Sequence, residues 1–372
     1  MNGARWAALV CVFSLLCAPA QRKKNKDEET QTLQEPRELP AAVVGETRRL
    51  AFHVTPLSSR GLLSQQIRDA LKAIARDSAG EKVLQIRAFV AGSGDVRRVR
   101  DLVSEVFTDR KQPLPALSLI QSGGLPLEGA QVVLEYITAA RKELQPYGLV
   151  FLSARSASSE NPQDPIPPLT SRSLAALRQT VKAAGSEPED VLRVTCFFSS
   201  LDQFEASRQI VGAEYPKAAL NFVQTERAPA RALAACEAVA RLRWNTGTPL
   251  TLSNAEGVPA EPGESQIALV NAPRVVLTGS QASFGYEEKD ARLAFERLRR
   301  VLQDCGASTA AVAFAHYYPL SAGIAAQVRK TRSEFLDQSH PPAGSILVFE
   351  SLSSMDAGFA MDVVAVQQGP ER

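Results

Sequence analysis

The sequence predicts an α+β protein made of three tandem copies of one unit, each a mixed sheet with two helices on one face. Three similar apolar strands support this prediction, at Glu81–Val90, Glu189–Phe198 and Thr309–Tyr318. Their spacing of about 110 residues indicates duplicated domains, because solenoid repeats are shorter. Helical periodicity precedes and follows each strand. The other strands are apolar on both faces, so we expect the three sheets to pack around a common axis that buries the second face.

Repeat one is expected to span residues 41–142. Apolar residues at helical spacing predict a helix over 62–77 and a second helix after Asp95. Strands are expected at 49–55, 83–90, 117–120 and 131–138. Gly123-Gly124 lies between the last two strands and predicts a hairpin there.

Repeat two is expected to span residues 147–243. The loop 161–168 holds four prolines and is expected to continue neither neighbouring element. Helices are expected at 174–184 and 201–213, the second with Asp202 as a capping candidate. Strands are expected at 150–153, 191–198, 219–223 and 232–240.

Residues 245–264 are rich in Gly, Pro, Thr and Ser and form the clearest expected linker. Repeat three is expected to follow over 265–367. It repeats the same order of elements, with helices around 293–302 and over 322–336. Its strands are expected at 275–278, 312–318, 345–349 and 360–366.

The N-terminus has the pattern of a signal peptide over residues 1–20. Arg5 precedes the apolar run Trp6–Leu16, and Ala18-Pro19-Ala20 supplies small residues for cleavage. The run is too short to span a bilayer, which takes about 20 residues. We therefore expect export to the periplasm or the extracellular space, with no membrane span in the mature chain. An uncleaved anchor and a misassigned start are the alternatives, and residues 21–40 are expected to be a charged, disordered tether.

Cysteine usage and charge limit the other options. Leu15 and Leu16 disfavour lipidation at Cys17, since small residues would be expected there. Of the cysteines beyond the leader, Cys196 and Cys236 fall in expected strands; one bridge is possible, but we expect small buried apolar residues.

The net charge of +2 gives no reason to expect a nucleic-acid partner. The histidines are His53, His316 and His340, and their spacing matches no metal site, so neither a metal nor another cofactor is expected.

The repeat resembles the Rid/YjgF family, in which imine and enamine deaminases form homotrimers of a chorismate-mutase-like subunit with clefts between subunits. The segments that carry the resemblance are Val191–Phe198, Tyr215-Pro216-Lys217-Ala218, Cys236–Leu242 and Leu277-Thr278-Gly279-Ser280-Gln281. The resemblance covers nearly all of residues 41–367 but contains no unbroken signature. It implies three Rid-like domains arranged as a pseudo-trimer within one monomeric chain.

The resemblance also implies a carboxylate on the last strand that helps to hold the attacking water. Glu135, Glu237 and Asp362 occupy this place in the three repeats, and Glu237 is the best candidate. A carboxylate in an apolar strand needs either a partner or a raised pKa. The alternative to catalysis is a carboxylate satisfied at a polar interface.

The family's substrate-binding arginine, in a Pro-Ala-Arg segment, is absent from all three repeats. Leu117, Ala218 and Gly344 stand at the expected positions. The resemblance places Arg155, Ser280 and Gln281 at strand ends where the family has cleft residues, and Lys217 adjoins a lost arginine. We expect these four residues to be the candidate ligand contacts.

Three functions remain open from the sequence. The leading expectation is binding of a small molecule in the clefts between repeats, with deaminase activity lost or altered. The second is an active imine or enamine hydrolase with a rebuilt site around Glu237, and the third is a non-catalytic scaffold.

Overall fold

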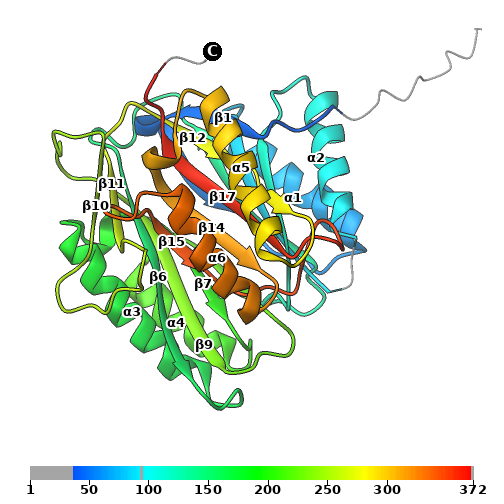
Figure 1. Cartoon of the computed structure of the whole chain (residues 1–372). Helices are drawn as coiled ribbons and strands as arrows, with labels where there is room; N and C mark the ends of the chain where they lie inside the picture. Colours follow the sequence, from blue (N-terminus) through cyan, green and yellow to red (C-terminus); the bar gives the residue numbers. More distant parts are fainter. Residues whose placement is uncertain (1–36, 93–94, 370–372) are drawn as a thin grey trace, which may run out of the picture. The chain divides into compact units, whose positions relative to one another are not determined.

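The structure is a computed structural model that describes residues 37–92 and 95–369. The expected signal peptide and the expected tether up to residue 36 lie outside the described residues. Within the described part of the chain there are three mixed sheets, each with two helices (Figure 1). The expected α+β class and the three tandem units are therefore confirmed.

The three repeats share one order of six elements, to which repeat three adds β13 (Gln281–Ser283) and, after β15 (Ala343–Ile346), the short strand β16 (Ser351–Leu352). In repeat one these are β2 (Leu50–Val54), α1 (Leu63–Asp77), β3 (Lys82–Ala91), α2 (Arg97–Asp109), β4 (Ala116–Ser122) and β5 (Val132–Ala139). In repeat two they are β6 (Leu149–Ser159), α3 (Ile166–Ala183), β7 (Val191–Phe198), α4 (Phe204–Glu214), β8 (Ala219–Gln224) and β9 (Ala232–Arg241). In repeat three they are β12 (Arg274–Thr278), β13 (Gln281–Ser283), α5 (Glu288–Asp304), β14 (Val312–Pro319), α6 (Ala322–Phe335), β15 (Ala343–Ile346) and β17 (Phe359–Val366).

The sheets are mixed because one pair of strands in each repeat is parallel. The pairs β3–β4, β7–β8 and β14–β15 are parallel, whereas β3–β5, β7–β9 and β14–β17 are antiparallel. Gly123-Gly124 therefore forms no hairpin, contrary to expectation. Instead Gly123 N donates to Gln224 O at 2.9 Å and joins repeat one to repeat two.

A β-bulge recurs at one place in every repeat. It lies between Val83 and Gln85, between Val191 and Arg193, and between Val312 and Phe314. A bulge puts two residues of one strand against one residue of its partner and so resets which side chains face each sheet surface. Matching Glu81–Val90 to Thr309–Tyr318 residue by residue would pair Ala315 with Arg87. The positions of the bulges show instead that His316 is the counterpart of Arg87.

Edge strands are exchanged between repeats, one given by repeat one and two given by repeat three. Strand β1 (Ala42–Glu46) of repeat one pairs with β12 of repeat three, and in Figure 1 it lies beside β12. Strand β11 (Ile267–Val270) pairs with β6 of repeat two, and β16 (Ser351–Leu352) pairs with β4 of repeat one. Each exchange covers an edge that would otherwise expose unpaired backbone groups.

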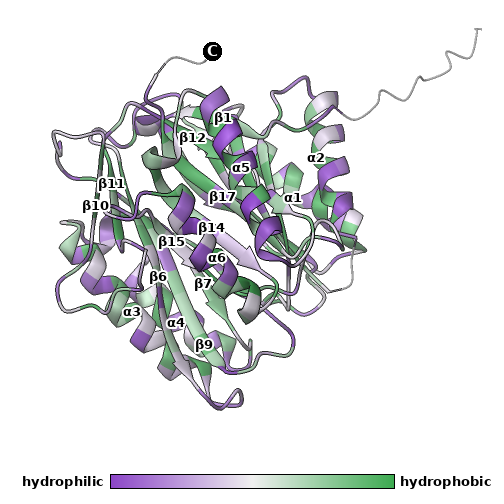
Figure 2. Cartoon of the chain, in the orientation of Figure 1, coloured by the Kyte–Doolittle hydropathy of each residue, from purple (hydrophilic) through white to green (hydrophobic). Residues whose placement is uncertain are grey.

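Two apolar clusters lie between the sheets, and each draws on all three repeats. One contains Phe52 of repeat one, Phe151 of repeat two and Phe314 of repeat three. The other contains Phe89, Phe197 and Tyr318 from repeats one, two and three. The second sheet faces are thus buried against one another as expected, and Figure 2 shows the hydrophobic colour concentrated on the strands.

Two local expectations were wrong, and the expected linker contains a strand. Helix α3 begins inside the proline-rich loop, because Pro167 and Pro168 fit its first turn. Backbone N–H groups in the first turn have no partner within the helix, so a proline there costs no hydrogen bond. Asp202 does not cap α4, whose N-cap is Gln203. The linker 245–264 is partly structured, since β10 (Leu250–Ser253) pairs with β11.

Cys196 and Cys236 form a disulfide, so the expectation of two separate buried thiols was wrong. The two residues lie opposite each other on β7 and β9, with a Cα–Cα distance of 4.1 Å. Both are completely buried. The pairing was not predictable because the two strands are distant in sequence and their register is not set by a local pattern.

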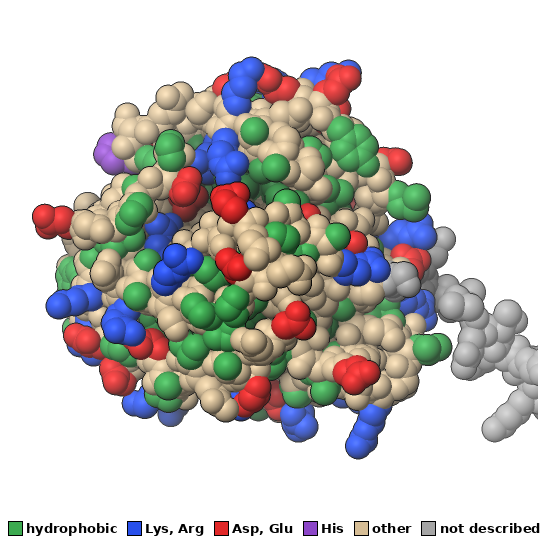
Figure 3. Space-filling view, turned by 90° about the horizontal axis from the view of Figure 1, so that it is seen from below, with side chains coloured by type: hydrophobic (Ala, Val, Ile, Leu, Met, Phe, Trp, Pro, Cys, Tyr) green, Lys and Arg blue, Asp and Glu red, His purple; other side chains and the backbone are tan. Residues whose placement is uncertain are grey.

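Charge is distributed without a dominant sign on the face drawn in Figure 3, where basic and acidic side chains alternate. Among the described residues, no helix has the length and hydropathy required to cross a bilayer.

Candidate functional site

The three predicted acids occupy equivalent positions at the centre of the molecule. Each lies opposite a polar residue of the neighbouring central strand, so that Glu135 pairs with Arg87, Glu237 with Thr195 and Asp362 with His316. The parallel strand adds one more polar residue to each set. These are Ser118, Asn221 and Ser345. All nine residues are at least 93% buried, so the site is a polar layer inside the protein.

Glu135 is held by donors from two repeats. Arg87 Nε of its own repeat donates to Oε2 at 2.8 Å. From repeat two, Thr195 Oγ1 and Asn221 Nδ2 donate to Oε1 at 2.5 and 2.7 Å, and Arg193 Nη1 lies 3.4 Å from Oε2. Both carboxylate oxygens therefore have fixed protein partners.

Glu237 is held between the other two repeats. Arg87 Nη2 of repeat one donates to Oε1 at 2.9 Å. From repeat three, His316 Nε2 lies 2.9 Å from Oε1 and Ser345 Oγ donates to Oε2 at 2.7 Å. The acid that the sequence favoured as a water-activating base is therefore fully engaged by protein groups.

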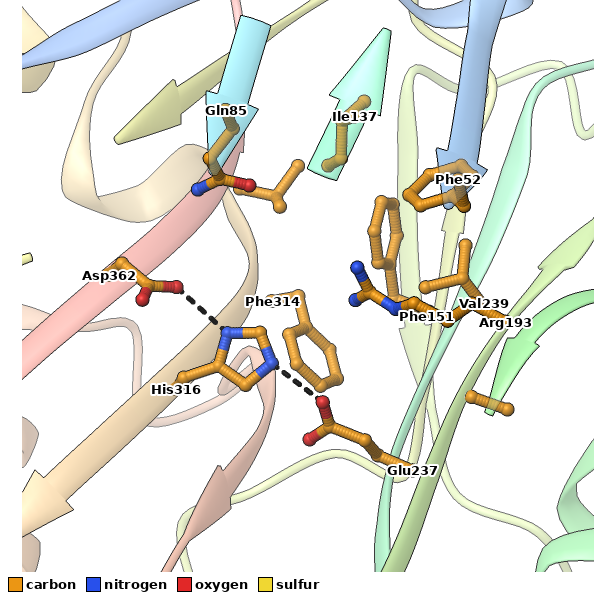
Figure 4. A pocket seen from close by; sticks show the side chains of 12 residues that line it. Phe52, Gln85, Ile137, Phe151, Arg193, Glu237, Val239, Phe314, His316 and Asp362 are labelled. Carbon is orange, nitrogen blue, oxygen red and sulfur yellow. Dashed lines mark hydrogen bonds and ion pairs between the residues drawn. The ribbon is translucent and has the colours of Figure 1, made fainter. Parts of the chain in front are cut away.

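His316 bridges two carboxylates (Figure 4). Its Nδ1 lies 2.8 Å from Asp362 Oδ1, while its Nε2 contacts Glu237. Tyr318 Oη donates to the second oxygen of Asp362 at 2.7 Å. Because ionised carboxylates only accept hydrogen bonds, both ring nitrogens must donate, and the ring is therefore an imidazolium.

The acids are ionised, although burial opposes it. Burial alone would raise the pKa of Glu237, but His316 and Arg87 outweigh it and hold that pKa well below the usual range. Burial is likewise outweighed at Glu135 by Arg193 and Arg87, and the pKa of Glu135 is lowered. The same balance, with His316 as the main cation, lowers the pKa of Asp362.

The cations respond in the opposite sense. Burial and Arg87 would lower the pKa of His316, but Glu237 and Asp362 raise it above its ordinary value. Burial would lower the pKa of Arg87, but Glu135, Tyr318, Glu237 and Asp362 together outweigh it and raise that pKa well above normal. Arg193 is the exception, because burial lowers its pKa despite the nearby Glu135, but a guanidinium group stays charged in proteins. Three cations thus balance three carboxylates, and the layer is close to neutral.

Little space remains beside this layer. The cavity shown in Figure 4 has about 10 Å³ for the centre of a water molecule, which is room for about one water. Glu237, His316 and Asp362 line its polar side, and Arg193 and Gln85 reach it from repeats two and one. Pockets that bind small molecules usually measure hundreds of cubic ångströms. The central layer therefore offers no room for a substrate.

Two of the seams between repeats are bridged by a hydrogen bond that a backbone amide donates. Ser280 N donates to Leu117 O at 3.1 Å, and a Cβ on Gly279 would come within 2.7 Å of that same oxygen. In the equivalent seam, Gly344 N donates to Ser153 Oγ at 2.8 Å. Glycine at position 279 permits this close approach.

The seam between repeats two and three contains a second buried ionic cluster. Arg155, at the bend of β6, and Arg332 of α6 both lie against Glu264, which comes from the linker. All three side chains are at most 8% exposed. Burial is the main cause that raises the pKa of Glu264 to about 7, and the arginines offset it only in part.

The remaining candidate ligand residues lie apart from the central layer. Lys217 is exposed on the turn between α4 and β8 and takes no part in it. Ser280 and Gln281 lie half-buried at the seam between repeats three and one, where Gln281 Nε2 donates to Gly279 O at 3.2 Å. Arg155 is the one member of this group that is deeply buried in a seam.

Strand pairing also corrects one of the lost-arginine positions. Leu117 and Gly344 lie opposite the residues just before Arg87 and His316, and Leu220 holds that place in repeat two. The position in repeat two is therefore Leu220, not Ala218. It follows Pro216 by two residues more than the corresponding positions follow their prolines in the other repeats. None of the three positions is an arginine, as expected.

Sequence reasoning missed the partners of the acids. These are Arg87, Arg193, Thr195, Asn221, His316, Tyr318 and Ser345. A polar residue inside each apolar central strand was the available signal, but the one-residue misalignment of repeat three hid the equivalence of His316 and Arg87. Within the described ranges, no group of His, Cys, Asp and Glu is arranged to hold a metal ion.

Comparisons with known proteins agree with this architecture. Residues 147–245, the middle repeat, match the sequence model of a family described as Endoribonuclease L-PSP. No curated protein matches the chain. The predicted family resemblance is confirmed for the middle repeat by the match to this family model.

Similar solved structures each cover about a third of the chain. A YjgF-family protein from Neisseria meningitidis is 16% identical, covers 32% of this chain and 96% of its own, and has a TM-score of 0.25. The Rid-family protein YyfB from Yersinia pestis is 20% identical, with coverages of 32% and 99% and a TM-score of 0.28. Yeast Mmf1 is 20% identical, with coverages of 32% and 98% and a TM-score of 0.24.

Proposed function

We propose that this Rid-like chain is an exported, monomeric pseudo-trimer that has lost imine and enamine deaminase chemistry and binds a small anion at the seam between repeats two and three. The observation that carries the loss is the engagement of all three acids by fixed protein donors. A carboxylate that activates water must accept a proton, so its pKa should lie near the working pH. The pKa values of Glu135, Glu237 and Asp362 are instead lowered.

The missing arginine supports the same conclusion. Leu117, Leu220 and Gly344 cannot supply the planar bidentate donor that a substrate carboxylate requires. The seams at Leu117 and Gly344 are moreover bridged by hydrogen bonds, from Ser280 N to Leu117 O and from Gly344 N to Ser153 Oγ. Anion binding at the seam between repeats two and three is supported by Arg155 and Arg332. Both guanidinium groups are buried, and both contact the single carboxylate of Glu264.

Export is supported by two independent features. The N-terminal sequence has the pattern of a signal peptide, and the Cys196–Cys236 disulfide is of the kind that persists in oxidising compartments. The chain contains its own three repeats, so no second copy is needed to complete the arrangement.

A scaffold role has one observation in its favour. Phe284, Tyr286 and Met355 are 47%, 56% and 91% exposed, and Tyr286 Oη donates to Met355 O at 3.2 Å, so part of this apolar group is contiguous. Exposed apolar groups of this kind can mark contacts with other proteins. We keep it as the second candidate.

Ammonia release from freshly generated 2-imino acids tests the loss of deaminase chemistry. The chain from residue 21 and its Glu237→Gln variant would be assayed beside an active Rid-family deaminase. We expect both to equal the uncatalysed rate while the family enzyme exceeds it. Release by the wild type that disappears in folded Glu237→Gln would contradict the proposal and favour a rebuilt hydrolase site.

A further inference from the structure

We infer that the linker between repeats two and three carries an internal ligand: Glu264 occupies an anion site formed by Arg155 and Arg332, and a small carboxylate competes with it. This inference rests on the proposed anion binding at that seam and names its occupant in the resting chain. The site belongs to residues outside the positions of the lost family arginine. Its parts come from β6, α6 and the linker.

The linker supplies most of the acceptors that surround the two guanidinium groups. Arg155 Nη2 donates to Glu264 Oε1 at 3.3 Å and its Nη1 to Pro259 O at 3.4 Å. Arg332 Nη2 donates to Pro262 O at 2.6 Å, and its Nη1 lies 3.9 Å from Glu264 Oε2. If the linker moves away, both arginines lose these partners together.

The site contains more positive charge than the linker neutralises. Two guanidinium groups face one buried carboxylate, and Glu261 is the further acid close enough to influence Arg155, but it is exposed. The remaining neighbours are uncharged. They are Ser153, whose carbonyl accepts from Arg155, and Tyr317, whose ring lies 5.9 Å from the Arg332 guanidinium. A buried surplus of positive charge favours a second anionic group.

The contacts of Glu264 are long for an ion pair. Strong pairs between guanidinium and carboxylate measure about 2.7–2.9 Å, whereas those of Glu264 measure 3.3 and 3.9 Å. The raised pKa of Glu264 agrees, because the arginines do not fully compensate its burial. A carboxylate that is not tied to the backbone could approach both arginines more closely.

The linker is fastened on both sides of this segment and exposed between them, because beyond Glu264 the Ser265 N donates to Pro342 O at 3.1 Å and the Ser265 O accepts from Ser153 Oγ at 2.6 Å. Gln266 Nε2 donates to Val258 O at 3.0 Å and Pro259 O at 2.9 Å, which anchors the segment just before the site. Residues 259–263 are exposed, and Gly263 has a φ of +70°, a conformation that glycine adopts without strain. Short exposed segments with few buried contacts open locally at low cost.

The test measures carboxylate binding with and without Glu264. Glu264→Ala removes the internal carboxylate, and Glu256→Ala, an exposed acid of the same linker, is the matched control. Acetate and succinate would be titrated against sodium chloride of equal ionic strength, with the thermal midpoint as the measure of binding. We expect the apparent dissociation constant of succinate to be at least tenfold lower for Glu264→Ala than for wild type and for the control.

Arg332→Met in the Glu264→Ala background should abolish the gain. Equal Arg332-dependent binding to wild type and Glu264→Ala would overturn the internal ligand but leave anion binding in place. Absence of binding to every variant would overturn both. Should Glu264→Ala fail to fold, Glu264→Gln removes the charge at nearly constant size, and the same titration decides the matter.

Discussion

Glu237 is a buried acid whose two carboxylate oxygens are both held by protein groups. It lies at a position that the family resemblance associates with water activation, yet its two oxygens contact Arg87, His316 and Ser345. A buried charge is tolerated when it is paired and hydrogen-bonded. Because its partners come from repeats one and three, Glu237 links these repeats to repeat two. Removing one charged partner would leave a buried charge uncompensated.

The imidazolium of His316 predicts a dependence of stability on pH. Its pKa is raised in the folded protein, so its contribution is fully present below the unfolded value of 6.5 and is lost as pH rises through the folded pKa. The unfolding free energy of wild type minus that of His316→Gln should therefore shrink as pH rises above 6.5. Urea denaturation over a pH series measures this difference. The exposed His340→Gln serves as control, and a difference that stays flat or grows would contradict the assignment.

At this scale the sequence could identify the acids but not their partners. A carboxylate inside an otherwise apolar last strand stood out at Glu135, Glu237 and Asp362. The donors come from other repeats, as Asn221 does for Glu135 and Ser345 for Glu237. Such contacts depend on the packing of three sheets, which no local pattern encodes. Glu264 was hidden for the same reason, since it lies at the end of a polar linker.

Strand exchange is the main feature at the scale of elements. Strand β1 belongs in sequence to repeat one but pairs with β12 of repeat three. The helices and central strands were predictable because their apolar periodicity is local. The exchanges were not, because β1 and β11 could equally satisfy their hydrogen bonds at another sheet edge.

The disulfide ties the two central strands of repeat two together. It closes a loop with a sequence separation of 40 residues. Restricting the unfolded chain over such a loop stabilises the folded state by about 2–4 kcal/mol. We expect the double variant Cys196→Ala/Cys236→Ala to lose that amount in non-reducing urea denaturation.

Cys305→Ala, which leaves the disulfide intact, is the matched control and should lose distinctly less. Equal losses in both proteins would show that the bridge contributes nothing beyond the packing of its side chains.

The whole molecule is organised around a charge-balanced layer between two apolar clusters. Arg87 from repeat one contacts acids of repeats one and two, and His316 from repeat three contacts acids of repeats two and three. Glu135 and Glu237 are therefore held by side chains of other repeats, and the three repeats are coupled through side chains as well as through exchanged strands. A common axis was predictable from the apolar strand faces, but a polar layer across it was not.

A double-mutant cycle between Arg87 and Glu237 tests this coupling most directly. Each single change, Arg87→Met or Glu237→Gln, should destabilise the protein by about 3–5 kcal/mol, since it leaves buried charge unpaired. In urea denaturation we expect the double variant to differ from the sum by about 1–3 kcal/mol. Arg87→Met combined with Glu256→Gln, a change at an exposed residue, should be additive. Additivity of Arg87→Met with Glu237→Gln would contradict a central layer that joins the repeats.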